Sequence, residues 1–204
     1  REAYDGLTSK QKKIVNNYKD LQAWEKSGKT TIKLSDQIDA VAIENKNGFA
    51  TKVEKLNESY DKLSAGEQAL VTNYKRLTDL TPFAKATGSF YSLKTKSPTY
   101  DKDVRDLLVT LNGLNTDNVT DSDDKAALQK LLDELLISVK KLESQLNNAD
   151  EVMTLISEAN DDDNFPNKND QLLAIQAART AYNDLPKEEQ KLVKNLKMLT
   201  ELEK

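Results

Sequence analysis

The chain has 204 residues, with 30 Lys and Arg against 34 Asp and Glu, a net charge of −4, and neither His nor Cys. Their absence excludes Ser-His-Asp and Cys-His catalysis, zinc sites of the usual ligand set, and disulfides. With 31% charged residues, 6% aromatic residues and few Gly or Pro, the composition favours an all-α protein built of small or elongated units.

Membrane and nucleic-acid partners are not expected. No run approaches the roughly 18 apolar residues of a membrane span. Residues 101–170 carry 7 basic and 17 acidic side chains, and no segment clusters Lys and Arg with interleaved aromatic residues, as nucleic-acid binding would need. The chain opens at Arg1 and closes at Lys204 inside helical patterns, so we expect it to be a fragment of a longer protein.

Three segments, at 3–25, 59–81 and 181–203, align without a gap. The same residue types recur at five positions, which are Tyr4, Tyr60 and Tyr182; Leu7, Leu63 and Leu185; Val15, Val71 and Val193; Asn17, Asn73 and Asn195; and Leu21, Leu77 and Leu199. This self-similarity indicates a repeated supersecondary unit, which changes the prediction for the whole fold.

Each copy is predicted to contain the end of one helix, a tight corner and a second helix. One apolar stripe precedes the corner, at Val53, Leu56, Tyr60 and Leu63 and again at Ile175, Ala178, Tyr182 and Leu185. A second stripe follows it, at Ile14, Val15, Tyr18 and Leu21, at Leu70, Val71, Tyr74 and Leu77, and at Leu192, Val193, Leu196 and Leu199. The corners themselves carry capping-box spacing in two copies, at Thr8 with Gln11 and Ser64 with Glu67, while the third has Pro186 with Glu189.

A shorter helix is predicted before each pair of helices. Ile38, Val41 and Ala42 follow a cap at Ser35 or Asp36. At an offset of 114 residues stand Val152, Leu155 and Ile156. The repeat offset elsewhere is 122, so this alignment places an eight-residue insertion at 160–170.

Three one-sided helices can bury all their stripes in a bundle of roughly 55 to 60 residues. We therefore predict an elongated tandem array of small three-helix bundles. Its parts are the C-terminal part of a first repeat at 1–26, a complete repeat at 27–83, a divergent repeat at 84–149, and a complete repeat at 150–204.

The divergent repeat is expected to contain a long helix near 121–147, with leucines and valine spaced 4, 3, 4, 3, 4 from Leu128 to Leu146. A shorter helix is marked by Val104, Leu107, Leu108 and Leu111. Residues 84–100, with Gly88 and Pro98, are predicted to be irregular. If 147–150 is helical, a nearly continuous helix of about 60 Å runs from Asp121 to Asn160.

The pattern V-x-x-L-I-x-x-A at 152–159, followed by A-x-x-A-Y-x-x-L-P-x-x-x-Q-x-x-V-x-N-L-x-x-L at 178–199, resembles a helical repeat of large secreted and wall-associated proteins of Gram-positive bacteria, including S-layer and S-layer-associated proteins. The copies at 36–80 and 1–25 are similar but weaker. The resemblance implies an extracellular location at the cell surface or cell wall. No S-layer homology module, sortase signal or catalytic domain accompanies it.

Two acidic clusters are candidate sites. Clustered carboxylates at Asp161, Asp162 and Asp163 with Asn164 would suit Ca²⁺, but they lack the EF-hand frame, so a solvated loop is the preferred interpretation. Carboxylates before the long helix are expected to cap it; these are Asp117, Asp121, Asp123 and Asp124. No cleft is expected that would hold a glycosidase carboxylate pair.

The recurring aromatic and amide residues are expected to be structural. The tyrosines Tyr4, Tyr60 and Tyr182 should pack in the core with their hydroxyls at the rim. The asparagines Asn17, Asn73 and Asn195 are expected to satisfy backbone groups of a neighbouring helix or loop. Trp24 replaces a leucine of the other copies and is predicted to plug a junction between domains.

We therefore expect a noncatalytic structural or spacer segment of a Gram-positive, S-layer-associated surface protein, not an enzyme, with no catalytic, cofactor-binding or metal residues and no cofactor. Two alternatives stay open, namely an adhesin or wall-polymer binding module, and an accessory helical region flanking an enzyme domain outside this fragment. The partners that these roles imply are cell-wall polymer, neighbouring surface-protein subunits or host protein.

Overall fold

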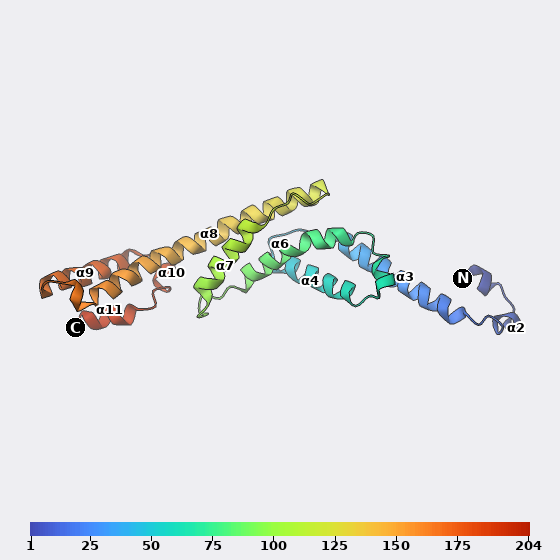
Figure 1. The fold of residues 1–204 in the computed structure, drawn as a ribbon, viewed down its shortest axis with the longest axis horizontal. Coiled ribbons are helices and arrows are strands. Elements are labelled where there is room, and N and C mark those ends of the chain that lie inside the picture. Colours follow the sequence, from blue (N-terminus) through green and yellow to red (C-terminus); the bar gives the residue numbers. More distant parts are fainter. The chain divides into compact units, whose positions relative to one another are not determined.

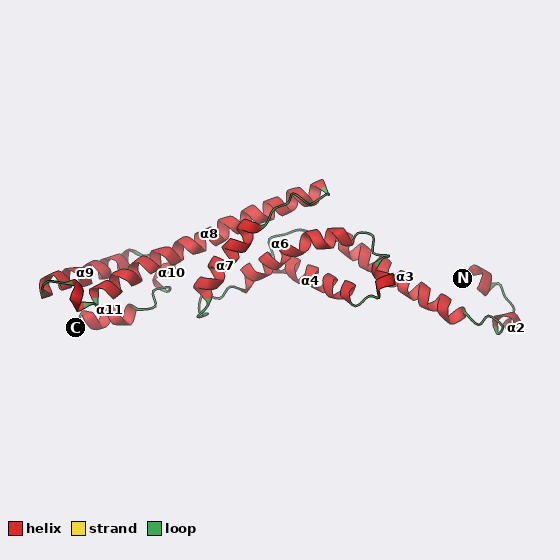
Figure 2. Cartoon of the chain, in the orientation of Figure 1, coloured by secondary structure: helices red, strands yellow, loops and turns green.

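The computed structural model describes residues 1–204 and is all-α, without a strand (Figures 1 and 2). Its elements, in chain order, are α1 Glu2–Asp5, α2 Ser9–Lys12, α3 Tyr18–Asp39, α4 Asn47–Asp61, α5 Ala65–Gln68, α6 Tyr74–Ser92, α7 Tyr100–Gly113, α8 Ser122–Ala159, the 3₁₀ helix η1 Asp162–Asn164, α9 Lys168–Asp184, α10 Lys187–Gln190 and α11 Leu196–Leu202. The all-α prediction is confirmed.

The chain divides into two compact units. The first comprises Arg1–Tyr91 and Leu114–Leu132, and the second comprises Ser92–Gly113 and Asp133–Lys204. The helix α8 contributes its first residues to the first unit and the rest to the second. The finer division into four repeats remains a prediction.

Both predicted capping boxes are present. At the start of α2, the backbone N–H of Thr8 donates to Gln11 Oε1 over 2.8 Å, and the Gln11 N–H donates to Thr8 Oγ1 over 3.4 Å. Ser64 and Glu67 make the same reciprocal pair at the start of α5, at 2.9 and 3.4 Å. The corners therefore form where the sequence places them.

The helix predicted after each corner is interrupted, which is a correction. In the second copy α5 ends at Gln68, and the backbone then makes three-residue turns, with Leu70 N–H donating to the Glu67 carbonyl, before α6 begins at Tyr74. Asparagine is a poor residue for a helix interior and a good one for its start, so Asn73 lies where the new helix begins. As a result, the side chain of Leu70 is 57% exposed, and that of Ile14, its equivalent in the first copy, is 80% exposed.

Within the first unit, α3, α4 and α6 contribute most of the buried apolar side chains. The buried residues are Leu34 and Ile38 on α3; Phe49, Val53 and Leu56 on α4; and Leu77, Leu80, Phe83, Ala84 and Ala86 on α6. The helices α4 and α6 approach closely at Gly88, where an added Cβ would lie 3.3 Å from Ala50 Cβ.

Two predicted helix boundaries are wrong. The short helix expected to start at Ser35 or Asp36 does not form as a separate element, because α3 runs unbroken from Tyr18 to Asp39 and ends before Val41 and Ala42. Residues 84–92, expected to be irregular, are the second half of α6, which passes through Pro82. In both helices the later turns carry buried residues, Leu34 and Ile38 in α3 and Phe83 to Thr87 in α6, and this burial outweighs the local helix-breaking signals.

The long helix is confirmed and extends beyond its predicted end. The helix α8 covers 38 residues from Ser122 to Ala159, including the junction at 147–150. Asp121 caps its start, since Asp121 Oδ1 accepts from the N–H groups of Asp123 and Asp124 over 3.0 and 2.8 Å. Five of the six residues of the predicted stripe are buried, and the sixth, Leu142, is half-buried; the buried residues are Leu128, Leu132, Leu135, Val139 and Leu146.

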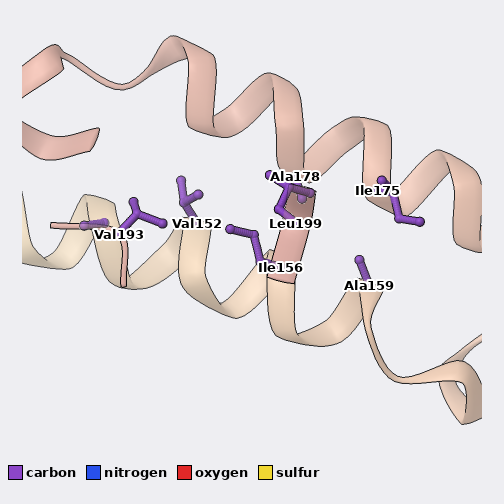
Figure 3. Packing of buried hydrophobic residues seen from close by; sticks show 8 residues of the cluster. Val152, Ile156, Ala159, Ile175, Ala178, Val193 and Leu199 are labelled. Atoms are coloured by element: carbon purple, nitrogen blue, oxygen red, sulfur yellow. The ribbon is translucent and has the colours of Figure 1, made fainter. Parts of the chain in front are cut away.

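The second unit has a core shared by α8, α9 and α11 (Figure 3). Figure 3 shows Val152, Ile156 and Ala159 of α8 gathered with Ile175 and Ala178 of α9 and with Val193 and Leu199. The helix α7 belongs to the same unit and joins α8 through Arg105, whose Nη2 donates to Asn147 Oδ1 and Asp150 Oδ2 over 3.0 and 2.9 Å.

The predicted offset of 114 residues between the first helix of the second repeat and the first helix of the last repeat is wrong by about one helical turn. Buried positions in α3 and α8 coincide at an offset of 118 instead, pairing Thr31 with Ala149, Leu34 with Val152, Ile38 with Ile156, and Val41 with Ala159. The difference from the 122-residue offset is therefore four residues, not eight. The connection between α8 and α9, residues 160–167, is only one residue longer than that between α3 and α4, residues 40–46; the other extra residues extend the end of α8 and the start of α9.

Candidate functional site

The acidic segment 161–164 is exposed and engaged in local hydrogen bonds. Asp161 Oδ1 accepts from the Asp163 N–H over 3.3 Å at the start of η1. Asp162 Oδ1 accepts from Gln171 Nε2 of α9 over 2.5 Å, and Asn164 Nδ2 donates to the Glu158 carbonyl over 3.4 Å. No three acidic side chains in the chain are grouped so that they could hold a metal ion.

The second acidic group contributes an ion pair as well as caps. Asp124 is 9% exposed and accepts from Arg76 Nε and Nη2 over 2.6 and 2.8 Å. The same guanidinium donates to the carbonyls of Ile38 and Val41 at the end of α3. The hydrogen bonds to Asp124 raise the pKa of Arg76. Arg76 thus joins α6, the end of α3 and the start of α8 within the first unit.

The recurring tyrosines stack on a second ring fourteen residues later. Tyr60 stacks on Tyr74 with ring centroids 3.6 Å apart, and Tyr4 stacks on Tyr18 at 3.7 Å. Fourteen residues after Tyr182 the chain has Leu196, so no second ring is present there. The Arg179 guanidinium lies 5.5 Å from the Tyr182 ring centroid instead. All three recurring tyrosines are partly buried, as expected for side chains packed at the rim of a core.

The predicted asparagine contacts are present in two copies. Asn73 Nδ2 donates to the Ser35 carbonyl and to Asp39 Oδ1 on α3 over 2.8 and 2.7 Å. Asn195 Nδ2 donates to the Met153 carbonyl and to Ser157 Oγ on α8 over 2.8 and 3.2 Å. The acceptors in the two copies are related by the same 118-residue offset as the core positions. The contact therefore fixes the register between the helices in both repeats.

The asparagine amide groups are used as donors only. Both Asn73 Oδ1 and Asn195 Oδ1 are buried without a hydrogen-bond partner. Exchanging the amide oxygen and nitrogen would set the oxygen of Asn73 against the Ser35 carbonyl, two acceptors facing each other, so the donor role is fixed by the neighbouring helix. Asn17, the third copy of this residue, is exposed and starts α3 with no side-chain cap bond.

Replacing Asn73 by Ala is expected to lower the free energy of unfolding by about 1 to 3 kcal/mol, because the part-buried hydrogen bond from its amide to the Ser35 carbonyl and the bond to Asp39 are lost. Asn17→Ala is the matched control, since it removes the same side chain where no neighbouring helix is bound. We expect the control to change stability by less than about 0.5 kcal/mol in chemical denaturation. Equal effects of the two substitutions would refute the register role.

Glu67 and Glu189, at the same position of their corners, make a contact with a neighbouring helix that the sequence patterns did not reveal. Glu67 Oε1 accepts from Ser27 Oγ of α3 over 2.6 Å, and Glu189 Oε2 accepts from Asn148 Nδ2 of α8 over 3.0 Å. The Ser27 hydroxyl and the Ser64 cap together lower the pKa of Glu67 to about 2. Each carboxylate thus joins its corner to the first helix of its repeat.

Glu67 makes stability depend on pH. Because its folded-state pKa of about 2 lies below the ordinary 4.5, the ionised form stabilises the fold above that ordinary value, and the contribution is lost as the pH falls from about 4.5 to about 2. We expect the denaturation midpoints of the wild type and Glu67→Gln to differ at pH 6 and to converge near pH 2. Glu151→Gln, an exposed substitution on α8, serves as control. A difference independent of pH would contradict the assignment.

Trp24 is not a plug between domains, which corrects the prediction. Its side chain is 79% exposed, whereas Leu80 at the same repeat position is fully buried. A shallow depression of about 510 Å³ lies beside it, lined by Tyr4, Val15, Asn17, Tyr18, Asp20, Leu21 and Trp24. The leucine is buried because other helices pack on it, and no helix packs on the tryptophan.

A second groove, of about 680 Å³, is lined by residues of α4 and α6. Its lining includes the acidic residues Glu54, Glu58 and Asp61 of α4, and Lys85 with small residues of α6. The groove is open to solvent.

None of the helices combines the length and apolar character required to cross a lipid bilayer. No family model, no curated protein and no solved structure matches this chain.

Proposed function

We propose that this chain is a noncatalytic spacer or scaffold segment of a Gram-positive surface protein of the S-layer-associated kind, located outside the cell. In this proposal, small three-helix repeats follow one another in tandem. The observation that carries it is the continuity of helices across predicted repeat boundaries. The third helix of one repeat and the first helix of the next are a single helix in α3, in α6 and in α8.

Continuous helices suit a spacer because a helix resists bending where a loop does not. The helix α8 contains 38 residues, about 57 Å at 1.5 Å per residue. The two helices that cross the other boundaries contain 22 and 19 residues. Serial units of this kind give an object whose reach grows with the number of repeats.

The placement of polar residues also supports a structural role. Hydrogen bonds between helices are formed by Asn73, Asn195, Glu67, Glu189 and Arg76. These bonds hold helices in register.

The proposal is tested by solution scattering together with retention on purified peptidoglycan, wall polymer and host matrix proteins. A spacer is expected to give an elongated scattering profile and no retention. A compact profile would contradict it, and saturable retention on one of these ligands would favour a binding module.

The binding module, an adhesin or wall-polymer receptor, is the second candidate, favoured by the 79% exposure of Trp24 beside its depression. An exposed indole is suited to stacking on a sugar or packing against an apolar partner. If this candidate holds, retention on a ligand should be lost in Trp24→Ala and kept in Leu173→Ala, which removes an apolar side chain that is 63% exposed on α9.

A further inference from the structure

One polar contact joins the segment before the corner to the helix after it in all three copies of the repeat. The two residues in contact are 24 positions apart in each copy. The pairs are Arg1 with Glu25, Asn57 with Thr81, and Arg179 with Glu203. Their hydrogen bonds measure 3.2 Å in the first copy, 2.9 Å in the second and 2.5 Å in the third. The second copy therefore keeps the contact but has smaller, neutral residues in place of the arginine and the glutamate.

In the first and third copies the arginine also lies over an aromatic ring. The Arg1 guanidinium is 5.4 Å from the centroid of the Tyr18 ring. The Arg179 guanidinium is 5.5 Å from the centroid of the Tyr182 ring, and it donates to both carboxylate oxygens of Glu203. These are the geometries of a cation–π contact and of a bidentate ion pair. The repeat thus holds a guanidinium at this place in two of its three copies.

The second copy retains the groups that surround the arginine in the first copy. Tyr74 occupies the repeat position of Tyr18. Asp61 occupies that of Asp5, whose Oδ2 accepts from Arg1 Nε over 3.1 Å. Both Tyr74 and Asp61 line the groove of about 680 Å³ along α4 and α6. The groove therefore offers a guanidinium a ring and a carboxylate, while the arginine that would use them is absent from this copy.

The charge of the groove favours a cationic ligand. Its lining contains the carboxylates of Glu54, Glu58 and Asp61 and the single ammonium group of Lys85. Lys62 Nζ lies 4.0 Å from Glu58 Oε2, a long contact between two exposed side chains. Carboxylates thus outnumber cations along the lining, and they are placed on the same helix as Asn57, the residue that replaces the arginine.

The arginines of this chain are all engaged elsewhere. Arg1 and Arg179 are bound within their own copies, and Arg76 and Arg105 bind carboxylates of α8. An arginine that enters the groove must therefore come from outside residues 1–204. Small ligands are usually enclosed by a concave pocket, whereas this groove is open to solvent, so it suits a side chain presented on the surface of another protein. Arginine is enriched at such interfaces.

We propose that the groove along α4 and α6 binds an arginine side chain of a partner protein. The bound guanidinium lies over the Tyr74 ring and pairs with Asp61, as the guanidinium of the first copy does with the equivalent residues. Glu54 and Glu58 attract basic residues that flank the arginine. This binding site does not depend on the spacer function.

The probe is a tetra-arginine peptide, acetylated and amidated, titrated into the full chain labelled with ¹⁵N at about 150 mM salt. We expect saturable changes of the amide chemical shifts at 54–61, 74 and 81–89. Tetra-lysine is the matched ligand and should bind at least about threefold more weakly, because an ammonium lacks the planar fork and stacking face of a guanidinium. Equal affinity of the two peptides, or shifts that follow the acidic residues 101–170 instead, would overturn the proposal.

Two protein variants test the geometry. Asn57→Arg combined with Thr81→Glu restores the pair of the other copies at unchanged net charge, so the chain's own guanidinium fills the groove. We expect tetra-arginine to bind this variant at least about tenfold more weakly, with unchanged circular dichroism. Asp61→Asn should weaken binding by about 2- to 5-fold, whereas Glu151→Gln, an exposed change on α8, should not. Undiminished binding to the double variant and to Asp61→Asn, or no shift at about 5 mM peptide, would refute the assignment.

Discussion

Replacing Ile137 by proline is expected to lower the free energy of unfolding by about 3 kcal/mol or more and to kink α8. Proline cannot donate to the carbonyl four residues earlier, and its ring collides with that carbonyl. Ile137 lies inside the 38-residue α8 and is 71% exposed, so the substitution removes no core side chain. The loss then measures the helix backbone itself, the part of the molecule that the proposed spacer depends on.

The matched control is Ile137→Ala, which removes the same exposed side chain and keeps the N–H donor. We expect the alanine variant to change stability by less than about 0.5 kcal/mol. Denaturant unfolding followed by far-ultraviolet circular dichroism measures both effects. If the proline and alanine variants had the same denaturation midpoint, α8 would not be a continuous helix at this position.

Replacing Ile156 by Ala is expected to lower the free energy of unfolding by about 2 to 5 kcal/mol. The Ile156 side chain is fully buried in the core where α8, α9 and α11 meet (Figure 3). Truncation removes buried methyl and methylene groups and leaves a cavity that rigid helices fill only in part. The measurement is the shift in denaturation midpoint at constant slope.

Leu173→Ala controls for this effect. Leu173 lies on α9 in the same unit but is 63% exposed, so its truncation should cost less than about 0.5 kcal/mol. A loss of under about 1 kcal/mol in Ile156→Ala would mean that the three helices do not share a tightly packed core.

The features that could be predicted from the sequence depend on residues that are close together in the chain or that recur in each repeat. The capping boxes at Thr8 and Ser64 could be predicted because a hydroxyl and a side-chain acceptor three residues apart satisfy helix-start N–H groups without help from distant residues. The helix α8 could be predicted because its stripe is long and regular. The hydrogen bond from Asn73 to a neighbouring backbone could be predicted because asparagine, a poor residue for a helix interior, recurs at one position of the repeat.

Register between helices was not predictable from the pattern alone. Shifting an amphipathic helix by four residues, about one turn, keeps the same face apolar. The offsets of 114 and 118 therefore describe nearly the same stripe. The hydrogen bonds from Asn73 and Asn195 to Ser35 and Met153 distinguish them, because each bond identifies a single carbonyl.

Contacts that are unique to one repeat were also missed. Arg76 occupies the repeat position at which the other copies have Asp20 and Met198, so the repeat pattern does not predict its contacts. Its departure from the repeat was the available signal, since a residue that breaks a repeat often contacts something that the other copies lack. Here it binds Asp124 and the end of α3.

The most direct test of the spacer account is the distance between spin labels at the two ends of α8. The chain contains no cysteine, so Lys125→Cys with Glu158→Cys, both exposed positions, can be labelled without a background. A continuous helix places these Cα atoms about 50 Å apart, and the account predicts one narrow distance distribution near that value. A broad distribution, or a mean below about 40 Å like that of a bent helix, would contradict it.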